Sequence, residues 1–165
     1  MRILGHLERY GPPVGGGVVT TVLVLRELAR RGHDVRIVTI RDLAENIPEI
    51  DWFEAASIEV VHQLYDWAEV VVPHMTATPT AMGYARPARK PVIYPIHDDG
   101  QLELYGLDSD DVALALFFSC GLRERTGFPG RQLVVHPPTF VEEYRVEQTG
   151  DAIVQLSLSS EKGGE

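Results

Sequence analysis

Short apolar runs and longer amphipathic segments alternate along this chain. The apolar runs are typical of buried strands and lie at 2–7, 34–40, 69–74, 92–96, 112–118 and 132–136. The amphipathic segments predict helices at 17–31, 55–67, 79–88 and 120–126. The first helix is expected to end at Gly32, a residue that commonly follows a last helical turn. Residues 43–54 stay unassigned, because Pro48 would break a helix there.

This alternation predicts an α/β domain with a doubly wound, mostly parallel sheet of about six or seven strands. The apolar run at 112–118 reads as a central strand that is buried on both faces. Ligands of such sheets bind beyond the carboxyl ends of the strands, where the strand order reverses. Candidate site residues therefore follow the predicted strands: His74, His97 to Asp99, Ser119 and His136.

A glycine run separates the first predicted strand from the first helix. Gly15, Gly16 and Gly17 allow a ligand to approach the backbone, and the helix start offers free N–H groups to an anionic oxygen. The spacing is neither the dinucleotide fingerprint nor a phosphate-binding Walker loop. A connector without a ligand is the alternative interpretation.

Composition narrows the class of partner. The chain has 165 residues, enough for one compact domain, and a formal net charge of −9. That charge argues against nucleic acid and against binding to anionic lipid, so no membrane association is indicated. Cys120 is the single cysteine, which excludes an internal disulfide and fits a cytoplasmic protein. No apolar run is long enough to span a bilayer.

Several segments, taken in order, resemble a known family. They are Arg2 to Leu4, the glycine run, Arg30 to Val35 (RRGHDV), Lys90 to Asp98 (KPVIYPIHD), Phe118-Ser119, Val134 to Phe140 and Asp151 to Gly164. Together they are similar to the N-terminal half of GT-B glycosyltransferases, in particular the large retaining group that uses nucleotide-sugar donors.

The resemblance implies a Rossmann-like, acceptor-side domain at 1–150, with 151–165 opening a donor-binding domain. The chain would then be part of a longer enzyme that moves a sugar from a nucleotide-sugar donor to an acceptor, with retention of configuration. We expect this part alone to be inactive. Neither a cofactor nor a metal is expected, and the partners would be the donor, the acceptor and the second domain.

The resemblance also assigns roles. His97 would hydrogen-bond the transferred sugar, and Lys162 would pair with donor phosphates. The other expected donor- or acceptor-binding residues are Gly15, Gly16, Gly17, His74, Asp98 and Ser119. An inverting enzyme would need a carboxylate such as Asp98 or Asp99 as general base, whereas a retaining enzyme would not. One departure is that Leu156 stands where the family often has a phosphate-binding arginine.

Three other interpretations remain open. The chain could be a free-standing nucleotide- or phosphate-binding module of flavodoxin-like topology, or a non-catalytic interaction domain. Among enzymes, a GT-B epimerase or phosphorylase is equally compatible with these residues.

Overall fold

A computed structural model describes residues 1–10, 16–40 and 47–136 of the chain. The strands are β1 (Arg2–Leu7), β2 (Asp34–Thr39), β3 (Asp51–Glu54), β4 (Val70–Pro73), β5 (Ile93–Ile96), β6 (Leu114–Phe117) and β7 (Gln132–Val134). The helices are α1 (Gly16–Arg30), α2 (Ile58–Trp67), α3 (Thr78–Ala85), α4 (Gln101–Leu104) and α5 (Cys120–Thr126), with a 3-10 turn at Met75–Ala77.

The strands form two parallel groups that join edge to edge. The first group has the order β3-β2-β1-β4 and the second β5-β6-β7. A parallel bridge between Val71 and Val92 connects β4 to β5 near their start. The strand order reverses between β1 and β4, so the carboxyl ends of these two strands form the topological switch point.

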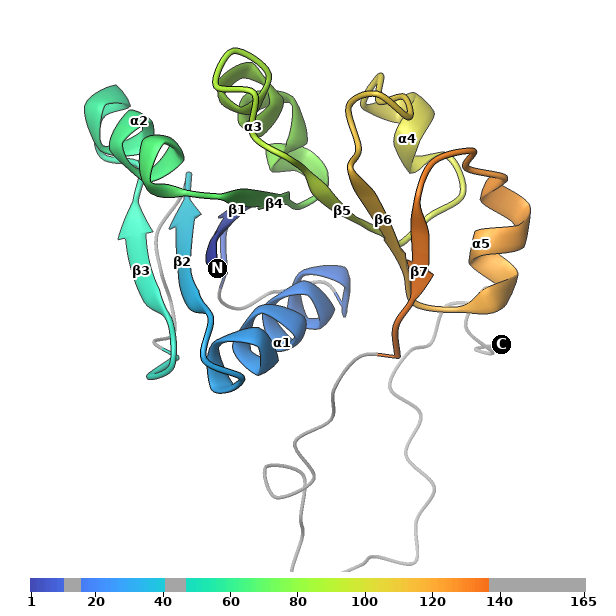
Figure 1. The fold of residues 1–165 in the computed structure, drawn as a ribbon, viewed down its shortest axis with the longest axis horizontal. Helices are drawn as coiled ribbons and strands as arrows, with labels where there is room; N and C mark the ends of the chain where they lie inside the picture. The colour runs from blue at the N-terminus through green and yellow to red at the C-terminus, as the bar shows by residue number, and fades with distance from the viewer. Residues whose placement is uncertain (11–15, 41–46, 137–165) are drawn as a thin grey trace, which may run out of the picture.

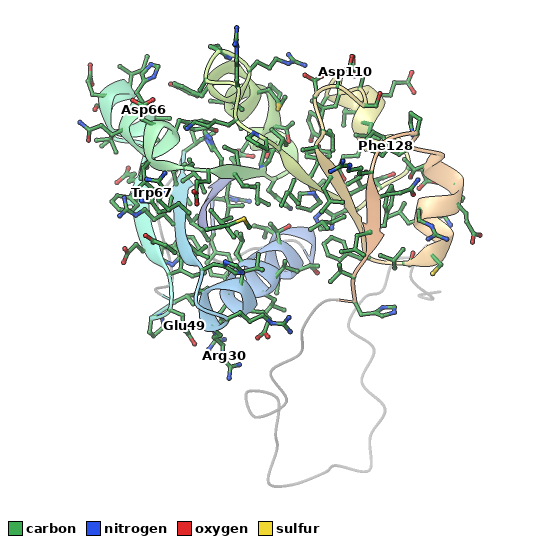
Figure 2. The ribbon with its side chains drawn as sticks, in the orientation of Figure 1. Arg30, Glu49, Asp66, Trp67, Asp110 and Phe128 are labelled. Atoms are coloured by element: carbon green, nitrogen blue, oxygen red, sulfur yellow. The ribbon has the colours of Figure 1, made fainter. Side chains whose placement is uncertain are left out.

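Helices cover the two faces of the sheet unequally. In Figure 1, α1 lies on one face, whereas α2, α3 and α4 lie on the other. Each face has its own apolar core. Ile3, Val22 and Leu25 belong to the core beneath α1, and Tyr65, Tyr94 and Phe117 belong to the opposite one. In Figure 2, Arg30 and Glu49 lie on the α1 side, and Asp66 and Asp110 lie on the other.

Most predicted elements are present, with shifted ends. The segment that stayed unassigned contains β3, a short edge strand whose side chains are exposed or half-buried. The predicted helix at 55–67 begins at Ile58, because the Ser57 hydroxyl caps it by accepting from the amide of Val60. Gly32 follows α1 with a φ of +88°, as a helix-ending glycine should. The short helix α4 was not predicted.

No helix among the described residues is long and apolar enough to cross a membrane. The segments 11–15 and 137–165, which include Gly15 of the glycine run and the expected start of a second domain, lie outside the described residues.

Candidate functional site

Two histidines and a glycine meet at the carboxyl edge of the sheet. His74 follows β4, His97 follows β5, and Gly17 lies in the first turn of α1. The imidazole rings approach edge to face, with centroids 5.3 Å apart. A Cβ on Gly17 would lie 3.3 Å from Cγ of His97 and 3.4 Å from Nε2 of His74. A glycine at this position therefore lets α1 begin directly against both rings.

Two more residues contact the ring of His97. It stacks on Phe118, which follows β6, with centroids 4.8 Å apart and an interplanar angle of 25°. Its Nε2 lies 3.2 Å from the hydroxyl of Thr21, one turn along α1 from Gly17. These contacts leave the ring a narrow choice of orientation.

A buried glutamine fixes the backbone at His97. Gln101, in α4, accepts the amide hydrogen of His97 at 2.8 Å. Its Nε2 donates to the carbonyl of Pro95 at 3.0 Å and to the hydroxyl of Tyr94 at 2.9 Å. One amide side chain thus satisfies three polar groups at the end of β5, where it is 2% exposed.

Burial keeps both site histidines neutral. It lowers the pKa of His74 to about 4, with His97 adding to the shift and the backbone of Gly17 opposing it. Burial alone lowers the pKa of His97 to about 4. At neutral pH each ring is therefore an uncharged imidazole with one donor and one acceptor nitrogen.

His74 carries two further marks of a functional position. Its side chain is 6% exposed, and its Nε2 has no hydrogen-bond partner among the described residues. A buried polar atom without a partner is costly, so native proteins contain few of them. The next residue, Met75, has a φ of +38°, in the left-handed region that non-glycine residues rarely adopt.

A third histidine, which is buried, lies nearby in the fold. His6, near the end of β1, places Nδ1 2.7 Å from the hydroxyl of Tyr65. Burial lowers the pKa of His6 to about 4. Its Nε2 also has no partner among the described residues.

The first turn of α1 is open to an anion. It contains no acidic residue, so no side-chain carboxylate of that turn competes for its amide hydrogens. Gly16 is exposed, and a Cβ there would meet nothing within 4 Å. Backbone N–H groups and the helix dipole favour a negatively charged oxygen at such a position.

The structure brings together some of the predicted residues and separates others. His97, His74 and Gly17 are in mutual contact, and Gly16 adjoins them in the chain. Asp98 is exposed beyond β5. Ser119 is exposed and caps α5, its hydroxyl accepting from the amide of Leu122 at 3.1 Å. Gly15 and Lys162 lie outside the described residues.

One acidic residue near this edge has a structural partner. Asp99 pairs with Arg125 at 2.8 Å, and this guanidinium lowers the pKa of the carboxyl. Cys120 is an exposed free thiol at the start of α5. Within the described parts of the chain, no three histidine, cysteine or acidic side chains gather as a metal site would require.

Sequence reasoning did not single out three residues that touch His97: Thr21, Phe118 and Gln101. Thr21 could have been found, because a spacing of four places it on the same helix face as Gly17. Phe118 stands at a strand end and could have been included with Ser119. Gln101 gave no signal, because its four-residue helix was not predicted.

An apolar groove of about 380 Å³ runs beside this cluster, between α1 and β5 to β7. Val24 and Leu28 of α1 form one side, and Ile93 and Leu116 form part of its floor. Thr21 and Phe118 line the groove and also contact His97, so the groove is continuous with the histidine pair.

No protein-family model matches the chain. No curated protein matches it either. Solved structures do. HepE from Anabaena, in complex with UDP and glucose, matches with a TM-score of 0.64 at 15% identity over 89% of this chain. The same protein in complex with UDP-glucose matches with a TM-score of 0.62 at 16% identity.

The glycosyltransferase GlyE of Streptococcus pneumoniae TIGR4 matches with a TM-score of 0.52 at 11% identity over 75% of this chain. The chain spans 47% of the HepE chain and 30% of GlyE. At these identities the likeness concerns the fold. The expected Rossmann-like α/β fold is thereby confirmed, and it matches one part of larger GT-B glycosyltransferase chains.

Proposed function

We propose that this chain is the acceptor-side domain of a glycosyltransferase that takes a sugar from a nucleotide-sugar donor. The observation that carries the proposal is the contact of two neutral histidines with Gly17 at the first turn of α1. This cluster lies beside the switch point of a Rossmann-like sheet, where such folds bind ligands.

The cluster offers two kinds of contact that a nucleotide sugar needs. The start of α1 favours the diphosphate through its amide hydrogens and dipole. The neutral imidazoles are suited to sugar hydroxyls, because each ring has a donor and an acceptor nitrogen. The fold likeness to HepE, which was solved with UDP-glucose, supports this choice of ligand.

In the proposed reaction, the bond between the anomeric carbon and the diphosphate oxygen breaks, and a bond from that carbon to an acceptor oxygen forms. The proton of the acceptor hydroxyl passes to the leaving diphosphate, with retention of configuration. Stabilising the charge on the leaving group is then the main catalytic task. Asp98 is not required as a base in this scheme, in keeping with its exposed position.

The proposal includes a second domain. Residues 1–150 would form the acceptor-side domain, and 151–165 would open a donor-binding domain in which Lys162 pairs with phosphate. The length of HepE, about twice the matched region, supports this division. On this basis we expect the 165-residue chain to transfer no sugar from UDP-glucose to water or to glucose. Release of UDP above that of a protein-free blank would contradict this expectation.

Binding tests the proposal directly. UDP-glucose, UDP and glucose are titrated into the chain and followed by the ring signals of the histidines. We expect UDP-glucose to shift His74 and His97. Replacing His97 by Ala should weaken UDP-glucose binding by about tenfold, the effect of losing one hydrogen bond. The control is His62→Ala on the exposed face of α2. No perturbation by UDP-glucose or UDP at millimolar concentration would overturn the proposal.

A further inference from the structure

The hydroxyl of Thr21 lies between two possible partners. Its Oγ1 is 3.1 Å from the carbonyl oxygen of Gly17 and 3.2 Å from Nε2 of His97. Thr21 is 1% exposed, so bulk water does not compete for these contacts. A threonine hydroxyl has one hydrogen to donate and lone pairs with which to accept.

The carbonyl decides the direction of both hydrogen bonds. A carbonyl oxygen only accepts, so the hydroxyl hydrogen of Thr21 points to Gly17. The oxygen of Thr21 then faces His97 with a lone pair. The contact at 3.2 Å is a hydrogen bond only if Nε2 of His97 carries the proton.

A neutral imidazole has one ring proton, so a protonated Nε2 leaves Nδ1 as the acceptor. His97 is neutral at pH 7, because burial lowers its pKa to about 4. Its Nδ1 lies beside the start of α1, 3.4 Å from where a Cβ of Gly17 would be. This nitrogen makes no hydrogen bond to another described residue.

Other contacts keep the ring in this orientation. Phe118 stacks against His97, the rings of His74 and His97 pack edge to face, and Gln101 holds the backbone amide of His97. A 180° flip of the ring would replace Nε2 by the Cε1 carbon and leave the oxygen of Thr21 without a hydrogen-bond donor on the ring. The contact with Thr21 therefore favours the orientation in which Nε2 faces it.

We propose that Thr21 is a positioning residue that holds His97 as the Nε2-protonated tautomer, so that Nδ1 accepts a hydrogen bond from a ligand hydroxyl. The lone pair of Nδ1 repels a phosphate oxygen, which leaves the anion to the amide hydrogens of α1. The site thus distinguishes the sugar from the phosphate part of its ligand. The ligand part of this inference rests on the proposed function, whereas the tautomer does not.

The tautomer is measured on the chain itself, without ligand. Long-range ¹H–¹⁵N spectra of the histidine rings at pH 7.5 distinguish a protonated from an unprotonated nitrogen. In the unaltered chain, His97 should show a protonated Nε2 and an unprotonated Nδ1. The opposite pattern, or an even mixture of the two tautomers, would overturn the proposal.

Three variants isolate the hydroxyl of Thr21. Thr21→Val keeps the shape of the side chain and removes the hydroxyl, so His97 should become a mixture of tautomers. Thr21→Ser keeps the hydroxyl and should restore the original pattern. Thr20→Val, at the adjacent and less buried position, is the matched control. An unchanged His97 pattern in Thr21→Val would refute the role of Thr21. If Thr21→Val does not fold, the unaltered chain and Thr21→Ser still decide the tautomer.

Ligand affinity supplies a second measurement. Thr21→Val should weaken UDP-glucose binding by about tenfold, the effect of one hydrogen bond, and leave UDP binding unchanged. Equal weakening of both ligands would contradict the division between sugar and phosphate. If the unaltered chain binds neither ligand, the proposed function fails, but the tautomer result stands on its own.

Discussion

At the residue scale, Gly17 shows how a missing side chain builds this site. The start of α1 approaches two imidazole rings so closely that a methyl group would press on both. Neither ring is charged at neutral pH, and the hydroxyl of Thr21 orders one of them. The arrangement of the cluster thus depends on the absence of a side chain at Gly17.

Gly17→Ala should disturb the site more than the stability of the fold. Alanine favours the helix by about 0.5–1 kcal/mol over glycine, which offsets the crowding against His74 and His97. We expect the free energy of unfolding to change by less than about 1 kcal/mol, while the ring signals of both histidines move.

Gly16→Ala is the matched control, because a Cβ at Gly16 has open space around it. Urea unfolding and histidine ring spectra are recorded for both variants. Equal spectral changes in the two variants would show that the close approach at Gly17 does not matter.

At the element scale, β5 and α4 act together. Pro95 has no amide hydrogen to give to a neighbouring strand, and its carbonyl binds the side chain of Gln101. The same side chain holds the amide of His97. A four-residue helix therefore fixes the end of the strand that presents the histidine.

Gln101→Met should destabilise the chain by about 2–4 kcal/mol, because it removes three hydrogen bonds to polar groups of Tyr94, Pro95 and His97. Methionine fills a similar volume, so the loss reports the hydrogen bonds. Gln63→Met on the exposed face of α2 is the control and should stay within about 0.5 kcal/mol. A small effect at Gln101 in urea unfolding would mean that water replaces the side chain.

Ser119→Ala separates a helix cap from a ligand contact. Loss of the hydroxyl that accepts from Leu122 should lower the free energy of unfolding by about 1 kcal/mol. Ser57→Ala removes the equivalent cap of α2 and should cost a similar amount. If Ser119→Ala, unlike Ser57→Ala, also weakens UDP-glucose binding, the sequence-based prediction that Ser119 contacts the ligand gains support.

At the scale of the whole molecule, the sheet is nearly two sheets. Beyond the bridge between Val71 and Val92, the part of the chain that the structure describes shows no further pairing between β4 and β5. His74 and His97 follow these two strands. The two histidines thus meet each other and the start of α1 at the carboxyl ends of two strands that are barely paired.

Three neutral histidines, two buried and one half-buried, make stability depend on pH. The pKa values of His6, His74 and His97 are about 4 in the folded chain, below the value of about 6.5 in an unfolded chain. The unfolded state therefore binds more protons between these values. The free energy of unfolding should fall with falling pH from 6.5 to 4, by up to about 1.4 kcal/mol per pH unit for each histidine.

Urea unfolding at pH 7.5, 6.5 and 5.5 measures this slope. Carboxyls with lowered pKa, such as that of Asp111, lose their contribution only below about pH 4, so they do not account for it. A free energy of unfolding that is the same at pH 7.5 and 5.5 would contradict the burial of neutral rings.

Much of the fold was predictable because its signals are local. The apolar runs of β1 and β6 and the spacing of Val18, Val22 and Leu25 in α1 report buried faces directly. The edge strand β3 and the short α4 were missed. The side chains of β3 are exposed or half-buried, and α4 is a single turn. Neither element therefore has a periodic pattern of apolar residues.

The sequence by itself determined the α/β class, the parallel sheet and the strand ends that carry His74 and His97. The reason is that strand periodicity and the alternation of elements depend on residues that are neighbours in the chain. Only the tertiary structure decided that Gly17 touches both rings, that Thr21 faces Nε2 and that Gln101 holds the end of β5. These contacts join residues up to 80 positions apart, such as Gly17 and His97. They arise from how α1 packs across the carboxyl edge of the sheet, which no local pattern encodes.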